Sequence, residues 1–183
     1  MCLNFGDKRA ECAYCKNMEL TGKLAEAFNQ QITLELTAAT VYRQLAAEME
    51  VLSFPGIANW FRAQSQEEIV HAEKFIMHMA DRGAHPKIGE QPAPSLNVRS
   101  VEDAFAASLA HEQKVSAAIR ELYRVAQNEA DLDCLPLLHW FIDEQVEEEA
   151  TVGEILDRVR LVGDDGSGLL RIEAELASRD SAE

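Results

Sequence analysis

The segment AQSQEEIVHAEKF, Ala63 to Phe75, has the periodicity of an amphipathic helix but carries two polar side chains on its apolar face. Counting in threes and fours places Glu68 and His71 where a core-facing helix usually has aliphatic residues. A buried charge without a partner is costly, so these two side chains need a reason to face inward. A carboxylate and an imidazole on one helix face are suitable ligands for a metal ion.

Three further segments have polar residues on their apolar faces. Glu35 and His71 are equidistant in sequence from the turn SFPG, and Glu112 and Glu148 are equidistant from the turn EADLDC. Residues equidistant from the turn of an antiparallel helical hairpin lie at the same height. The sequence therefore predicts one polar layer in the core, made of Glu35, Glu68, His71, Glu112, Gln145 and Glu148.

The composition of this layer predicts a metal site. Four converging glutamates would repel one another without a cation, and no lysine or arginine occupies the same apolar faces at that height. Carboxylates, one imidazole and one amide suit iron or manganese, with zinc as a competitor. The pattern is close to the di-metal carboxylate arrangement, in which two helices each supply Glu and two supply Glu-x-x-His.

The two ligand motifs of the layer differ. The first is complete as Glu68-Ile69-Val70-His71, whereas the second is Gln145-Val146-Glu147-Glu148 and lacks a histidine. One ion would therefore keep an imidazole, and the other would have only oxygen ligands, fewer and weaker. This asymmetry favours a site that passes its second ion onward over one that holds a permanent cofactor.

Helical periodicity covers most of the chain, and no strand-like alternation is present, so the predicted class is all-α. Short turns join the first two and the last two long helices, which predicts two antiparallel hairpins. A helix of this size is about 40 Å long and needs roughly 12 extended residues to be spanned, so the stretch 84–100 can connect parallel helices. The expectation is a four-helix bundle with one long crossover, its helices at about 20–50, 57–82, 101–128 and 136–162, with a short final helix in 169–178.

The charge balance limits the partners. Acidic residues outnumber basic ones by 32 to 17, for a net charge of −15, which argues against nucleic acid or an anionic membrane and favours small cations. No apolar run approaches the roughly 20 residues of a membrane span, and the N-terminus lacks a secretory pattern. A cytoplasmic location is expected.

Three of the four cysteines precede the periodic segments. Cys12 and Cys15 have C-x-x-C spacing, but no second ligand pair follows, so a zinc or redox role is not predicted. Residues 1–18, which also contain Cys2, are expected to form a mobile extension, and residues 19–183 the helical domain. Cys134 lies in the second hairpin turn.

Four motifs together resemble the ferritins, specifically the non-haem bacterial type: LEL, QEEIVHAEKF, HEQ and FIDEQVEEE. The resemblance extends from about Leu20 to Ser178. It implies a ferritin-like bundle, a shell of 24 identical subunits and a ferroxidase centre in each bundle. Fe(II) would be oxidised there by dioxygen or peroxide and stored as ferric mineral.

The resemblance also implies roles for individual residues. The first iron would be bound by Glu35, Glu68 and His71. The second would be bound by bridging Glu68, with Glu112 and Glu148, and with Gln145 nearby. Tyr42 matches a tyrosine beside the ferritin centre. A third iron position would use Glu67, Glu144, Glu147 and Glu148.

The sequence departs from some ferritins. Ile69 replaces the haem-ligating methionine of bacterioferritin, so no haem is predicted. Leu135 and Leu138 replace the acids that line the three-fold pores of animal ferritins, which points to another route for iron.

Other functional classes fit less well. A soluble di-iron oxidoreductase, such as a rubrerythrin-like peroxidase or an oxygenase, would be expected to have a second Glu-x-x-His. A light-chain-like subunit would lack the complete polar layer. A DNA-protecting mini-ferritin would lack the final short helix.

Overall fold

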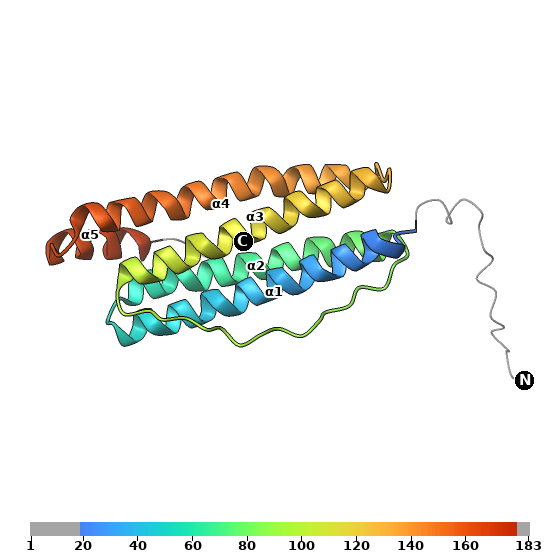
Figure 1. Ribbon diagram of the computed structural model, residues 1–183. Helices are drawn as coiled ribbons and strands as arrows, with labels where there is room; N and C mark the ends of the chain where they lie inside the picture. The colour runs from blue at the N-terminus through green and yellow to red at the C-terminus, as the bar shows by residue number, and fades with distance from the viewer. Residues whose placement is uncertain (1–18, 179–183) are drawn as a thin grey trace, which may run out of the picture.

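The computed structural model describes residues 19–178 (Figure 1). Within this range the chain forms five helices and no strand, which confirms the all-α prediction: α1 (Gly22–Val51), α2 (Pro55–Asp81), α3 (Val101–Asn128), α4 (Leu135–Val162) and α5 (Gly166–Leu176). None of the helices described is both long and apolar enough to cross a bilayer.

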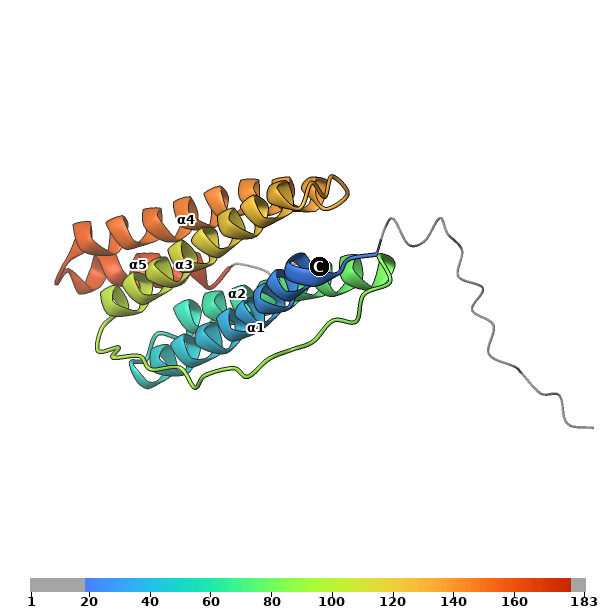
Figure 2. The same cartoon turned by 45° about the vertical axis from the view of Figure 1, so that its right-hand side comes forward.

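The helices have the predicted topology. α1 and α2 form one hairpin, α3 and α4 the other, and the hairpins pack together through α1 and α3. The order around the bundle is therefore α2, α1, α3, α4. The crossover, residues 82–100, runs the length of the bundle beside α1 (Figures 1 and 2). Its backbone is held by α1 side chains, since Lys87 N donates to Asn29 Oδ1 at 2.7 Å and Gly89 N to Thr33 Oγ1 at 2.8 Å.

Both hairpin turns contain a non-glycine residue in the left-handed region. Ser53 has φ 66° and Ala130 has φ 54°, and each is the midpoint from which the ligand pairs are equidistant. The following amides close the turns, with Phe54 N donating to Met49 O at 2.9 Å and Asp131 N to Ala126 O at 3.0 Å. The turns thus set the register that brings the polar residues to one height.

Side-chain oxygens cap the starts of α3 and α2. Ser100 Oγ accepts from Asp103 N at 3.0 Å at the start of α3. At the start of α2, the Glu173 carboxylate of α5 accepts from Gly56 N at 2.6 Å and Ile57 N at 2.8 Å. This contact docks the short final helix onto the bundle (Figure 1).

The apolar core has two parts, one on each side of the polar layer. One part lies toward the first turn and α5, and includes Met49, Phe61 and Phe105; the other includes Phe28, Phe75 and Phe141. The apolar faces counted in threes and fours along the sequence are buried except on α3, where the count from Phe105 to Glu112 predicts that Leu109 faces the core. There Ser108 is buried and Leu109 is only partly buried, so the serine faces the core instead.

Candidate metal centre

All six residues of the predicted polar layer lie inside the bundle between the two apolar clusters. Their side chains are between 0% and 6% exposed: Glu35, Glu68, His71, Glu112, Gln145 and Glu148. The four long helices each contribute at least one of them. The structure therefore brings together residues as far apart in the sequence as Glu35 and Glu148.

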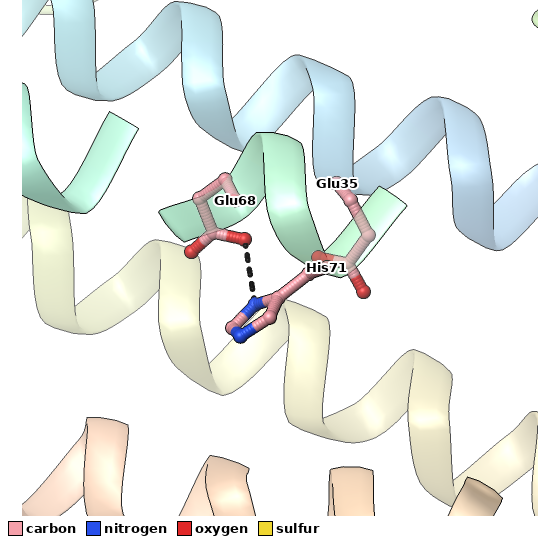
Figure 3. A group of neighbouring side chains, drawn as sticks. All are labelled: Glu35, Glu68 and His71. Carbon is pink, nitrogen blue, oxygen red and sulfur yellow. Dashed lines mark ion pairs between the residues drawn. The ribbon is translucent and has the colours of Figure 1, made fainter. Parts of the chain in front are cut away.

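Glu35, Glu68 and His71 form a fully buried group, with one ligand atom of each lying within 4.8 Å of the others (Figure 3). His71 Nδ1 is 3.4 Å from Glu68 Oε2. Three polar atoms here are buried without a hydrogen-bond partner: Glu35 Oε2, Glu68 Oε2 and His71 Nδ1. Buried polar atoms that lack a hydrogen-bond partner destabilise the folded protein, and a shared cation would satisfy all three.

Glu112 is held differently, by donors from two helices. The Tyr42 hydroxyl donates to its Oε1, and Gln145 Nε2 donates to its Oε2 at 3.1 Å. Ser108 Oγ donates in turn to the Tyr42 oxygen at 3.1 Å. These contacts fix the Glu112 carboxylate, and they place Tyr42 and Gln145 beside the layer.

Two buried amides support the carboxylates, a role that residue spacing alone did not indicate. Gln31 Nε2 donates to Glu35 Oε1 at 2.8 Å, and Gln64 Nε2 donates to Glu148 Oε2 at 2.9 Å. The available signal was a glutamine one turn before an inward-facing glutamate on both α1 and α2. Each amide orients one carboxylate.

A second group of carboxylates lies between α2 and α4, next to the layer. Glu67, Glu144 and Glu148 each offer an oxygen within 4.8 Å of the others, and the first two are partly exposed. His71 Nε2 is 3.9 Å from Glu144 Oε1, so the two groups are adjacent. Glu147, also predicted for a third iron position, is exposed and lies outside this group of three.

The electrostatics of the layer oppose full ionisation. Burial, together with the charge of Glu68, raises the pKa of Glu35 well above its ordinary value. Burial, followed by the charges of Glu112 and Glu148, does the same to the pKa of Glu68. Burial also raises the pKa of Glu112, although its hydrogen bonds from Tyr42 and Gln145 act in the opposite direction. A cation would lower all of these pKa values.

Aromatic side chains cover one side of the group formed by Glu35, Glu68 and His71. The His71 ring makes T-shaped contacts with Trp140 and Phe141, with centroids 5.7 and 5.5 Å away, and Phe141 stacks on Phe75 with centroids 4.1 Å apart. Partly exposed Trp140 also carries Lys74 Nζ over its ring at 4.5 Å. This packing limits the movement of the imidazole.

Of the four cysteines, only Cys134 lies within the described residues. Cys2, Cys12 and Cys15, and the predicted extension 1–18, lie outside them. Cys134 is buried at the start of α4, where burial and the Asp131 carboxylate raise the pKa of its thiol to about 12. Of the two leucines in the pore comparison, Leu138 is buried and Leu135 is partly buried.

The fold and the clustered carboxylates define a four-helix-bundle protein with a candidate metal site in its core. The ferritin family model, described as a ferritin-like domain, matches residues 25–162. The chain therefore belongs to the ferritin family.

Known relatives agree with this assignment. A bacterial non-heme ferritin of Staphylococcus haemolyticus is 38% identical over 160 residues, covering 87% of this chain and 96% of that protein. One from Staphylococcus aureus is 36% identical with the same coverage. Among solved structures, an engineered closed form of the Archaeoglobus fulgidus ferritin has a TM-score of 0.88 at 34% identity, covering 90% of this chain and 100% of that one. The open-pore ferritin of the same archaeon has a TM-score of 0.86 at 34% identity, covering 88% and 100%.

Proposed function

We propose that this chain oxidises Fe(II) at a paired site in its helical bundle and stores the ferric product inside a shell of identical chains. The observation that carries the proposal is the buried group Glu35, Glu68 and His71, with its three orphaned polar atoms, in a member of the ferritin family. Iron is the substrate and the stored cargo.

The ligands divide between two ions. Glu35, Glu68 and His71 bind the first. Glu68 bridges to the second, which Glu112 and Glu148 complete with Gln145 close by. Because burial raises the pKa values of Glu35, Glu68 and Glu112, iron binding displaces the protons they hold, and uptake of Fe(II) releases acid.

The paired arrangement suits a two-electron oxidation. Each of two Fe(II) ions gives one electron to the same dioxygen, which takes up two protons and leaves as hydrogen peroxide, so no one-electron oxygen radical is released. Peroxide can itself accept two electrons from another Fe(II) pair and two protons from solution, yielding two molecules of water. The carboxylates stabilise Fe(III) over Fe(II) by charge, and the hydrogen bonds to Glu112 keep its ligand geometry constant.

The product leaves toward the acidic side of the bundle. The second ion has no imidazole ligand, so it is held less firmly than the first. Glu67, Glu144 and Glu148 provide a third iron position next to it, with exposed Glu147 beyond. We propose that ions pass along these carboxylates to the mineral. No haem takes part, since Ile69 stands at the position of a haem ligand in bacterioferritin.

The storage function needs an assembly. We propose a homo-oligomeric shell, with 24 subunits as in the family resemblance, located in the cytoplasm. Apolar side chains near the bundle ends support burial against other copies, because Leu132, Leu161 and Leu170 are 73%, 86% and 62% exposed in the single chain.

The proposal can be tested with a matched pair of substitutions on α2. Glu68→Gln removes the bridging carboxylate, whereas Glu73→Gln makes the same change at an exposed position. Apo-protein titrated with Fe(II) without oxygen should bind two ions per chain in the wild type and in Glu73→Gln, the second more weakly than the first, as expected for a di-metal site of about two ions. On admission of oxygen, both should oxidise Fe(II) quickly. If Glu68→Gln oxidises Fe(II) as fast as Glu73→Gln, the assigned centre is wrong.

A further inference from the structure

A groove lies on the surface between α1 and α3, away from the acidic side of the bundle. Its volume is about 360 Å³. Its walls are mainly aliphatic, with Ala27 and Leu34 on α1 facing Ala118, Leu122 and Val125 on α3. The small alanine side chains on both walls leave the space between the helices open.

The floor of this groove connects it with the candidate metal centre. Gln31 lines the groove, is only 3% exposed, and donates through Nε2 to Glu35 Oε1 at 2.8 Å. A single side chain therefore separates the groove from the carboxylate proposed to bind the first iron. Glu35 Oε2 lies beyond it, buried without a hydrogen-bond partner.

The groove and the acidic group lie on opposite sides of the bundle. The order α2, α1, α3, α4 places the α1–α3 side opposite the α2–α4 side, where Glu67 and Glu144 are found. Hydrated Fe(II) requires oxygen ligands along its path, which the α2–α4 side supplies. Of the described residues that line the groove, Glu121 alone is charged, and it is exposed.

The chemistry of the groove suits the other substrate. Dioxygen is small, neutral and apolar, so it loses little hydration in a path walled by alanine, leucine and valine. An ion would lose its water there without gaining ligands. The groove also reaches the first iron position without crossing the cluster that binds the second.

We propose that the α1–α3 groove is the path by which dioxygen reaches the centre, and that Gln31 is the residue at its inner end. Iron and oxidant then use opposite sides of the bundle, so iron on the acidic side does not obstruct the oxidant. This inference rests on the proposed ferroxidase function, because it names the route of that reaction's second substrate.

The test is to fill the groove without touching an iron ligand. Ala118→Leu adds bulk to the α3 wall, and Ala117→Leu makes the same change at the neighbouring exposed position as a control. Ala27→Leu fills the groove from the α1 wall, which guards against a folding defect peculiar to one variant. The initial rate of Fe(II) oxidation is measured against dioxygen concentration, and Fe(II) binding is titrated without oxygen.

We expect kcat/KM for dioxygen to fall by about fivefold in Ala118→Leu and in Ala27→Leu, with the rate at saturating dioxygen unchanged. Anaerobic Fe(II) binding should match the wild type, and Ala117→Leu should match it in both measurements. The inference is overturned if both groove variants keep the wild-type dependence on dioxygen. A wild-type protein that consumes no dioxygen with Fe(II) instead refutes the proposed function, and the inference with it.

Discussion

Replacing Glu68 by glutamine should stabilise the metal-free protein while removing its iron chemistry. Glu68 is 1% exposed, and its Oε2 has no hydrogen-bond partner. Glu112 and Glu148 both oppose its charge. A glutamine has nearly the same shape, carries no charge, and presents an amide that can donate to these carboxylates. The substitution therefore relieves a cost that the metal otherwise offsets.

The size of the effect follows from the burial of that oxygen. A buried polar group without a partner costs about 1–3 kcal/mol, and a charged group costs more. We therefore expect Glu68→Gln to raise the unfolding free energy of the apo-protein by about 1–3 kcal/mol near pH 8. In a chain of this size, each kcal/mol corresponds to a rise in Tm of about 2–4 °C.

The gain should depend on pH. Burial raises the pKa of Glu68 above its ordinary value of 4.5, so the folded protein binds more protons there than the unfolded protein does. Stability contributed by this group therefore falls as pH rises from about 4.5 through the folded-state pKa. The difference between Glu68→Gln and the wild type should be small near pH 4.5 and should increase toward pH 8.

Calorimetry of the apo-proteins across this pH range measures the difference, with Glu73→Gln as the control for losing an exposed charge. Adding Co(II), which does not oxidise readily, at about 100 times its Kd should stabilise the wild type by about 2.7 kcal/mol per site. The variant should respond less. A metal-free Glu68→Gln protein that is less stable than the wild type at pH 8 would refute the reasoning.

Three further substitutions test separate contacts. Tyr42→Phe removes the hydroxyl that donates to Glu112 and should slow Fe(II) oxidation about tenfold, a loss of about 1.4 kcal/mol, in stopped-flow absorbance; an unchanged rate would contradict the positioning role. Gly56→Ala should lower Tm and loosen α5 in hydrogen exchange, because the new Cβ would lie 2.5 Å from Glu173 O; normal protection of α5 would argue against this docking. Gly153→Ala, inside α4 with no atom within 4 Å of the new Cβ apart from its chain neighbours and the adjacent helix backbone, should instead stabilise by about 0.5–1 kcal/mol in chemical denaturation, and a loss of stability would contradict this.

Much of the fold could be predicted because helix limits, loop lengths and distances from a turn can be counted along the sequence. Helical periodicity predicted the observed limits of α3, Val101–Asn128. The length of the crossover indicated that α2 and α3 run parallel and not antiparallel. The height of the polar layer followed from counting outward from Ser53 and Ala130. The structure adds the reason, since both residues adopt the left-handed conformation that closes the turns.

Details that depend on helix rotation were harder to predict. Adjacent residues on a helix point about 100° apart, so counting placed Glu148 of the run EEE at 147–149 in the polar layer but did not show how far its neighbour Glu147 is turned away. The structure turns Glu148 inward and Glu147 outward, and it turns Ser108 rather than Leu109 into the core. The supporting amide of Gln31 could not be assigned, because a hydrogen bond depends on a rotamer and not on spacing alone.

Iron loading tests the central claim most directly. Apo-protein is given a large excess of Fe(II) in air and then passed through a sizing column while iron and protein are both followed. The account predicts that iron elutes with a particle the size of a many-subunit shell, at far more than two ions per chain. A small particle that retains only about two ions per chain, as a single di-metal site would, contradicts storage and makes the centre that of a soluble di-iron enzyme.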